Sequence, residues 1–272
     1  MKRFVVFVLA LCAFGAVAMA QKSIPHAVRT INAVTVRRTE IVLPKVKGFN
    51  CYKGDFHIHT SYSDGRVNPA GRVVEAWVDG LDVIAITDHY EGRRGEQNFF
   101  KVIAPYNPDV QYQSAKKANG VKADFNAIHQ EAVNQLEKSG YPMLLIKGCE
   151  MARNPETHGH FNALFLEDIN GLYDEDLTEA FRKVKAQGGI IIHNHPAWRR
   201  KTSDKTEFHE KVYGEGLIDG VEVVNGQTFY PHIVRRCIDE KLTMFANTDE
   251  HSLISHRYGQ VGCFRTMTII FA

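Results

Sequence analysis

The stretch Asp55-Phe-His-Ile-His59 places two histidines one residue apart at the end of an apolar run, and Asp64 follows five positions later. Along an extended strand successive side chains point to opposite faces, so His57 and His59 share one face while Ile58 points to the other. Two imidazoles on one face are suited to hold one metal ion. The same spacing also occurs on the solvated face of an edge strand, and this stretch alone does not separate the two interpretations.

Imidazole and carboxylate groups recur where other apolar, strand-like segments end or begin. Each one singly is explained by a helix cap or by a hydrogen-bonded structural histidine. The set is harder to explain in that way, because burying many titratable groups together is costly unless a cation compensates them. In parallel α/β folds the carboxyl ends of the strands line the functional face, where we expect these groups to converge: His57, His59, Asp88, His89, Glu150, His160, His193, His195, Asp249 and His251.

The residue types narrow the choice of metal. Imidazoles mixed with carboxylates and without thiolates suit Zn²⁺, Mn²⁺ or Fe²⁺ better than Ca²⁺ or Mg²⁺, which prefer oxygen ligands. A single catalytic zinc takes three protein ligands, so about nine candidates indicate two or three divalent ions bridged by a carboxylate and a water. Such clusters are typical of phosphoester hydrolases, because two cations hold both the attacking and the departing oxygen.

The elements that must position these groups alternate along the chain. From about residue 50 onward, short apolar runs rich in β-branched residues alternate with stretches of helical period, which predicts an α/β fold with a parallel sheet, either a barrel or an open doubly wound sheet. Asn68 and Pro69 indicate a helix start, and Gly80 indicates its end. The predicted strands are 51–59, 81–87, 143–149, 161–166, 189–193, 221–224, 243–247 and 266–271, and the predicted helices are 69–79, 124–138, 176–187 and 231–241.

The first twenty residues have the pattern of a secretory signal peptide. Lys2 and Arg3 precede an apolar run that ends before Gln21, which predicts cleavage after Ala20 and an exported, periplasmic protein; the run is too short for a membrane span. Cys12 follows a leucine rather than a small residue, so a lipoprotein is the lesser alternative. Residues 21–48 form a leader, and residues 91–122 form a long connection of the kind that covers active sites.

The charge balance excludes some classes of partner. Removing the signal peptide takes two of the 33 basic residues and leaves 31, equal to the 31 acidic residues. A near-neutral protein has no broad electrostatic surface for a nucleic-acid polymer or an anionic lipid, so any phosphate recognition must be local.

Taken in order, the motifs DFHIHT…SDG, TDH, G-x-E, a later His, HP and TDEH resemble the PHP superfamily, named for polymerase and histidinol phosphatase, in its branch of small bacterial metal-dependent phosphoesterases. The resemblance runs from about Gly48 to His251. It implies a distorted (β/α)7 TIM-like barrel over residues 49–272 with a two- or three-metal site at the strand C-termini. His158 and His193 are second choices, and the ligands that the resemblance implies are His57, His59, Asp64, His89, Glu150, His160, His195, Asp249 and His251.

The resemblance also implies the reaction, which is hydrolysis of a small phosphate ester by a metal-bridged water. Asp249 is then both ligand and catalytic group, and His193 is a proton donor. The chain ends at TMTIIFA, where family members continue with a further helix, so we expect a truncated C-terminal end. The alternative activity is that of a metal-dependent amidohydrolase or deacetylase on a related barrel, which the ligand order disfavours.

Arginines that follow two of the motifs are candidates for binding the substrate phosphate. Arg93 and Arg94 follow the second metal motif, and Arg199 and Arg200 follow the HP motif. The planar fork of a guanidinium suits phosphate, although any single loop arginine is more often a solvated charge. Export favours a small scavenged phosphoester over a cytoplasmic substrate.

Overall fold

The computed structural model describes residues 37–90, 113–114, 121–122, 124–259 and 264–272, and the elements discussed here belong to one unit, Arg38–Ala272. The predicted signal peptide, residues 21–36 of the leader, Arg93 and Arg94 lie outside the described residues. No helix among the described residues is long and apolar enough to cross a membrane.

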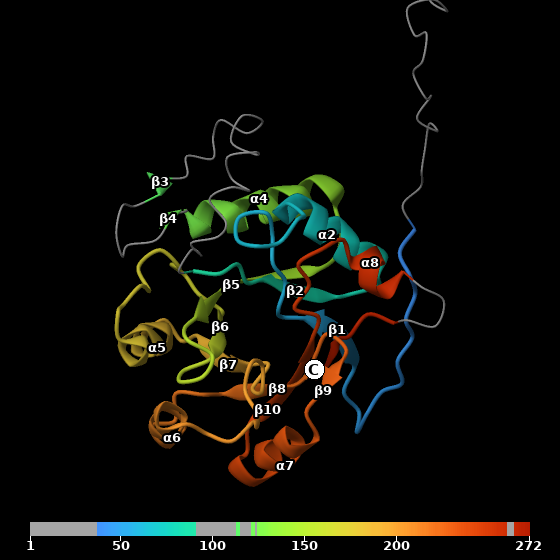
Figure 1. Ribbon diagram of the computed structural model, residues 1–272. Helices are drawn as coiled ribbons and strands as arrows, with labels where there is room; N and C mark the ends of the chain where they lie inside the picture. The colour runs from blue at the N-terminus through green and yellow to red at the C-terminus, as the bar shows by residue number, and fades with distance from the viewer. Residues whose placement is uncertain (1–36, 91–112, 115–120, 123, 260–263) are drawn as a thin grey trace, which may run out of the picture. The chain divides into compact units, whose positions relative to one another are not determined.

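A nine-stranded sheet forms the centre of this unit (Figure 1). Its strands are β1 (Cys51–Asp55), β2 (Val83–Ile86), β5 (Leu144–Ala152), β6 (His160–Leu164), β7 (Ile190–Asn194), β8 (Gly220–Asn225), β9 (Thr228–Phe229), β10 (Thr243–Asn247) and β11 (Thr268–Phe271). Along the main path the order is β10-β8-β7-β6-β5-β2-β1-β11, and β9 pairs with β8. The short β3 (Gln113–Ser114) and β4 (Val121–Lys122) pair separately.

The sheet is mixed, where the sequence predicted a parallel one. β1, β2 and β5 run parallel, as do β7, β8 and β10, but β6 is antiparallel to both its neighbours and β11 is antiparallel to β1. Only residues 153–159 separate β5 from β6. A parallel crossover needs a dozen or more residues, so this connection makes β6 turn back.

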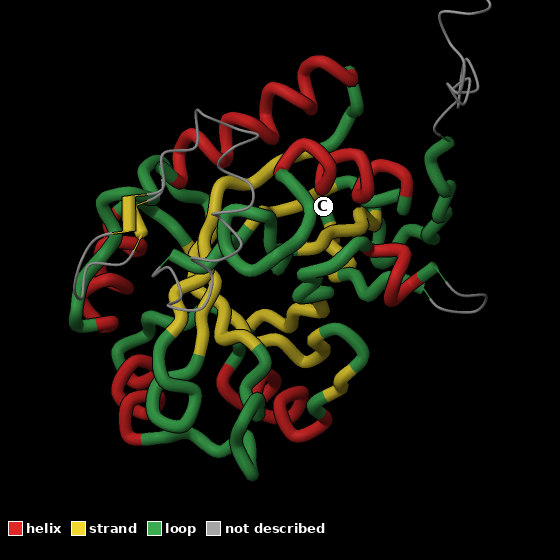
Figure 2. Tube along the Cα trace, turned by 45° about the horizontal axis from the view of Figure 1, so that its top comes forward, coloured by secondary structure: helices red, strands yellow, loops and turns green. Residues whose placement is uncertain are grey.

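The sheet is curled (Figure 2). The segments that follow β1 and β10 lie side by side. Ile58 and Glu250 form an isolated parallel bridge, the Asp249 N–H donates to the His57 carbonyl at 2.9 Å, and the His59 N–H donates to the Glu250 carbonyl at 3.1 Å. This pairing brings the first and last histidine motifs together. The curl agrees with a barrel-like fold, and the (β/α)7 arrangement stays a prediction.

Helices pack on the outer face of the curl. They are α2 (Pro69–Val78), α4 (Phe125–Ser139), α5 (Leu177–Ala186), α6 (Glu207–Gly214), α7 (Pro231–Glu240) and α8 (Ile254–Tyr258). Asn68, Asp124 and Asp176 are the N-cap residues of α2, α4 and α5, and each side chain accepts a backbone N–H of the first turn. The four predicted helices are confirmed, whereas α6 and α8 were not predicted.

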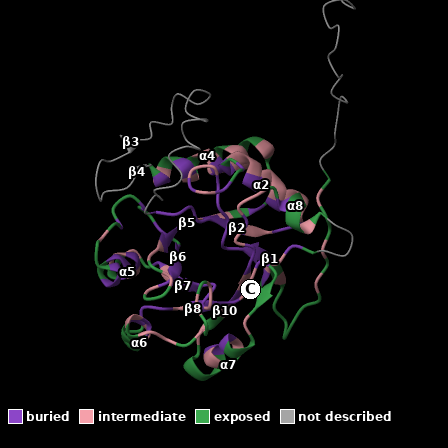
Figure 3. Cartoon of the chain, viewed as in Figure 1, coloured by how far each residue is buried: buried purple, intermediate pink, exposed green. Residues whose placement is uncertain are grey.

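The central strands are largely buried, and the helices around them carry exposed residues as well (Figure 3). Alternation along the strands separates an inner from an outer layer. The inner cluster takes its buried residues from strands and from the segment after β1, with none from a helix: Phe56, Ala85, Ile146, Leu164, Ile192 and Phe245. In the outer layer, Phe161 and Ile191 pack with residues of α5. Toward the end of the sheet that carries the predicted ligands, the inner strand positions become polar yet stay buried: Asn162, Asn194, Glu222 and Asn247.

Candidate metal centre

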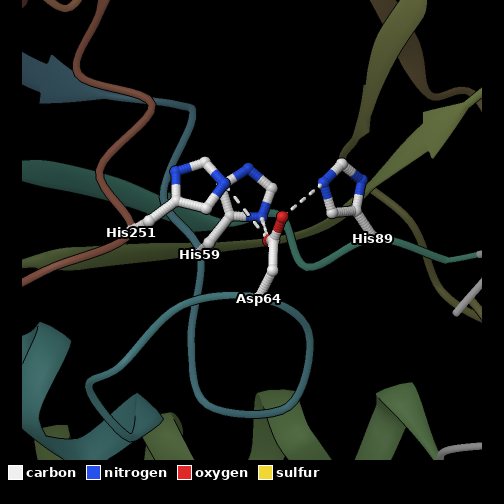
Figure 4. A group of neighbouring side chains, drawn as sticks. All are labelled: His59, Asp64, His89 and His251. Atoms are coloured by element: carbon white, nitrogen blue, oxygen red, sulfur yellow. Dashed lines mark ion pairs between the residues drawn. The ribbon is translucent and has the colours of Figure 1, made fainter. Parts of the chain in front are cut away.

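The nine ligands implied by the PHP resemblance lie together in the structure. Their nitrogen and oxygen atoms form four overlapping groups, and within each group the atoms lie within 4.8 Å of one another. His57, His59, His89 and Glu150 each belong to two groups. The groups are His59, Asp64, His89 and His251 (Figure 4); His57, His59 and Glu150; His57, His195 and Asp249; and His89, Glu150 and His160.

The spacing of the central atoms is that of ligands around one ion. The Nε2 atoms of His57 and His59 are 3.1 Å apart, and Asp249 Oδ1 lies 3.1 and 3.2 Å from them. Glu150 Oε1 is 3.5 Å from His57 Nε2, and Glu150 Oε2 is 3.4 Å from His59 Nε2. Two atoms bound to Zn²⁺ at about 2.0–2.2 Å and a tetrahedral angle are about 3.3–3.6 Å apart.

Glu150 stands at the centre of the cluster. It is 1% exposed, and its carboxylate lies 2.8 Å from His89 Nδ1, 3.2 Å from His160 Nδ1 and 3.5 Å from His195 Nε2. Oε2 of Glu150 and Nδ1 of His89 are both buried and lie 2.8 Å apart, yet neither makes a hydrogen bond of acceptable geometry. Because buried polar atoms are rarely left unsatisfied, these two atoms and the mixed imidazole and carboxylate donors fit divalent cations.

Asp64 joins the cluster from the turn that follows the first two histidines (Figure 4). Its carboxylate lies 3.4 Å from His59 Nδ1 and from His89 Nε2, and 3.2 Å from His251 Nε2. The His59 and His251 rings stack with centroids 4.1 Å apart. Asp64 therefore completes one of the four ligand groups together with histidines from three separate segments.

Local backbone features hold the ligands in place. Asp88, the carboxylate of the TDH motif, accepts the Thr60 N–H at 2.7 Å and the Thr60 and Ser63 hydroxyls at 2.6 Å, so it fixes the turn that carries Asp64 instead of joining the ligands. His195 and Asp249 have φ values of 26° and 51°. Positive φ is unfavourable for residues with a side chain, and such strain is concentrated at functional sites.

The charges in the cluster are strongly coupled. Burial opposes a charge on His57, but Asp249, Glu222 and Glu150 raise its pKa well above the ordinary value. Burial likewise opposes a charge on His89, yet Glu150 and Asp64 raise its pKa to about 10. Burial would raise the pKa of Glu150 and Asp249, but the neighbouring imidazoles hold it well below its usual range. The carboxylates thus stay ionised and attract positive charge, as metal ions would provide.

The two second-choice histidines lie away from this cluster. In β7, Ile192 points to the inner layer, so His193 points outward, where its ring lies 4.7 Å from the Phe161 ring and its Nδ1 lies 2.8 Å from the Tyr213 hydroxyl. His158 is half-buried and packs against Phe208. The position of His193 does not support the predicted role of proton donor, because neighbouring strand residues face opposite sides.

His209, which packs against His193, should make the protein sensitive to acid. Its Nε2–H donates to the His158 carbonyl at 2.6 Å, its Nδ1 accepts the Thr206 N–H at 3.0 Å, and burial lowers its pKa to about 4. In the unfolded chain the His209 imidazole is protonated with a pKa of about 6.5. The free energy of unfolding should therefore fall by up to about 3 kcal/mol as the pH drops below about 6.5, and it should level off near pH 4. Urea unfolding of His209→Asn should show a weaker pH dependence than wild type; equal slopes would contradict this.

Of the two predicted substrate arginines that the structure describes, Arg199 lies close to the cluster. The Trp198 ring is 5.0 Å from the His160 ring and 5.3 Å from the His195 ring, and the exposed Arg199 stacks its guanidinium 4.5 Å from the same indole. Arg200 instead donates to two backbone carbonyls of its own loop. Of these two, Arg199 is therefore the better placed to meet a bound anion.

The sequence reasoning missed the buried polar residues beneath the ligands. Asn194 donates to Glu150 Oε1 at 2.9 Å and to Asn162 Oδ1 at 2.8 Å, and Glu222 lies 2.9 Å from His57 Nδ1. A sequence signal existed for Glu222, because it interrupts an apolar strand at a position that alternation assigns to the inner face, whereas Asn194 follows His193 at the end of its strand. Through these hydrogen bonds the two residues hold the candidate metal ligands Glu150 and His57 in place on the sheet.

Comparisons with known proteins agree with this geometry. No family model and no curated protein matches the chain. Among solved structures, a two-domain protein from Bacteroides vulgatus containing a predicted PHP-like metal-dependent phosphoesterase is 38% identical, with a TM-score of 0.72. The match covers 87% of this chain and 63% of that one, so the chain spans less than two thirds of its relative.

Two further structures are more distant. A candidate metal-dependent phosphoesterase from Bifidobacterium adolescentis is 16% identical with a TM-score of 0.51, covers 74% of this chain and 88% of that one, and shows similarity of fold alone. An amidohydrolase from Chromobacterium violaceum, at 12% identity and a TM-score of 0.48, is too distant to bear on this chain. On its motifs and on the Bacteroides relative, the chain belongs to the PHP superfamily.

Proposed function

We propose that this chain is an exported metal-dependent phosphoesterase, with a distorted (β/α)7 barrel, that hydrolyses a small phosphate ester in a two- or three-ion site. The observation that carries the proposal is that Glu150, the one carboxylate among the four shared residues, belongs to two groups. Ligands are shared when ions lie close together, and ions about 3.5–4 Å apart are typical of phosphoester hydrolysis.

The distances between candidate ligand atoms suggest how the residues of the four overlapping groups would divide among Zn²⁺, Mn²⁺ or Fe²⁺ ions. His57, His59, Glu150 and Asp249 would hold one ion, Glu150, His160 and His195 a second, and Asp64, His89 and His251 a third. When bound, the ions would lower the pKa of a water molecule and neutralise the charge that grows on the phosphoryl oxygens.

The chain's own groups hold and orient the candidate ligands. Burial would raise the pKa of Asp249, but the surrounding imidazoles hold it well below its usual range, so its carboxylate is ionised, as a metal ligand must be. Its Oδ2 accepts a hydrogen bond from Asn225 at 3.3 Å, which fixes the direction of the carboxylate. Arg93 and Arg94 remain proposed substrate contacts, beside Arg199.

Replacing Arg199 with Ala should raise KM for an anionic phosphate ester about tenfold and leave kcat nearly unchanged, because one charge-assisted contact contributes about 1.5 kcal/mol. The matched control is Arg235→Ala, which removes an exposed arginine of α7 that pairs with Asp239. Steady-state kinetics with an aryl phosphate measure both. An unchanged KM in Arg199→Ala, or an equal rise in the control, would contradict the assignment.

The class of substrate is tested by comparing bond types. Purified protein loaded with Mn²⁺ or Zn²⁺ is assayed against an aryl phosphomonoester, an aryl phosphodiester and an N-acetylated sugar. Release of phosphate or phenol from a phosphoester, with the acetamide left intact, is the expected result. Deacetylation without phosphoester cleavage would instead favour an amidohydrolase or deacetylase on the same ligands.

A further inference from the structure

Glu222 is a carboxylate of β8 that is fully buried. Its Oε1 accepts hydrogen bonds from His57 Nδ1–H and from the Asn247 amide, both at 2.9 Å. Its Oε2 accepts the backbone N–H of His195 and the Asn225 amide, both at 2.8 Å. The carboxylate therefore has four N–H donors, and two of them belong to candidate metal ligands.

Packing alone does not explain a carboxylate at this position. The inner layer that Glu222 faces is filled elsewhere by apolar side chains of the neighbouring strands, such as Ile192 and Phe245, and a hydrophobic residue of similar volume is often tolerated in place of a buried charge. Burying a carboxylate costs several kcal/mol before its hydrogen bonds compensate. Because burial of the Glu222 carboxylate is costly and the carboxylate contacts the candidate ligand His57, we expect it to have a role in the site.

We propose that Glu222 is a positioning residue that sets the metal affinity of the site by fixing His57 and His195; this inference rests on the proposed metal-dependent function. Accepting the proton of His57 Nδ1 leaves the lone pair on Nε2, the atom that faces His59 Nε2 and Asp249 Oδ1. The same hydrogen bond makes Nε2 a more basic ligand. At His195, the bond to the N–H holds the backbone at its φ of 26°.

The substitution Glu222→Gln tests the proposal with little change in shape. A glutamine amide has one acceptor and one donor end, so either the His57 Nδ1–H or the His195 N–H loses its acceptor. Competition of Zn²⁺ against a chromophoric chelator should show affinity reduced by about 10- to 100-fold. The matched control is Asp219→Asn: Asp219, beside β8, accepts the Ile191 N–H of β7 at 2.7 Å and pairs with Lys185, so its substitution should leave the affinity unchanged.

A second measurement does not depend on the variant folding. In ¹⁵N spectra of the imidazole rings, His57 of the wild type should carry a proton on Nδ1 both without metal and with Zn²⁺ bound. Absence of that proton, or wild-type Zn²⁺ affinity in folded Glu222→Gln, would overturn the role of Glu222. Failure of the wild type to bind any ion would instead refute the proposed function, and the spectrum would still report on the His57–Glu222 bond.

Discussion

Replacing Glu150 with Gln should lower kcat/KM for a phosphate ester by about 10³-fold or more, since Lewis-acid stabilisation of the transition state amounts to several kcal/mol and each 1.36 kcal/mol is tenfold in rate. Both Glu150 oxygens face histidine nitrogens, with His89 Nδ1 at 2.8 Å and His160 Nδ1 at 3.2 Å. A glutamine would turn its NH₂ toward one of them and could not bridge two ions. Kinetics and elemental analysis of the purified variant should show lost turnover and fewer bound ions.

The matched control is Glu240→Gln on α7, which alters a surface glutamate that pairs with Lys205. It should keep wild-type turnover and metal content. Circular dichroism should show that Glu150→Gln retains its secondary structure, because the backbone of Glu150 stays paired with Asn162 in the ladder between β5 and β6. A folded Glu150→Gln protein with full metal content and more than a tenth of wild-type activity would refute a bridging role.

Replacing Arg72 with Met should destabilise the protein by about 3–5 kcal/mol, because it leaves buried acceptors without their charged donor. Arg72 is 1% exposed and projects from α2 beneath the site. Its guanidinium donates to the backbone carbonyls of His59, Glu250 and Ser252 at 2.8, 3.0 and 2.8 Å, and to the Glu75 carboxylate at 2.7 Å. Arg72 thus ties together the two segments that carry the first and last histidine motifs.

Urea unfolding in the presence of a chelator measures this effect without a contribution from bound metal. Methionine keeps most of the aliphatic stem, so the loss reports on the guanidinium. The comparison variant is Arg182→Met, which breaks exposed pairs with Glu179 and Glu215 and should cost at most about 1 kcal/mol. If both variants lost the same small amount of unfolding free energy, the hydrogen bonds of Arg72 to the two segments would not be important for stability.

Most of the candidate ligands were accessible from the sequence because they follow or open an apolar run, whereas Asp64, in the turn after His59, came from the family resemblance. His57, Glu150 and Asp249 stand next to strand-like segments, and the pairing rules of α/β sheets bring such ends together. Helices α2, α4, α5 and α7 were equally accessible from their helical period, with the Asn68 cap marking the start of α2, whereas α6 and α8 were missed. Residue types and the alternation of apolar and polar positions along the chain are sufficient to predict these features.

The features that could not be predicted depend on the direction of a strand in the sheet or on which of its residues point to the inner face. His193 and His195 are equivalent as residue types, and the inward direction of Ile192 is what sends His193 to the helices. The reversal of β6 follows from a short connection whose length carries no motif. Glu222 reads as a stray polar residue until the fold places it against His57, because that contact joins residues 165 positions apart.

The most direct test of the central claim is the amount of metal that the protein binds, measured together with the activity that the metal confers. The metal-free protein is titrated with Zn²⁺ or Mn²⁺, and bound ion and phosphate release from an aryl phosphate are followed in the same samples. We predict two to three ions per chain, with hydrolysis appearing as the shared ligand groups around Glu150 fill. Binding of one ion or none, with no hydrolysis at saturation, would contradict a multi-ion phosphoesterase.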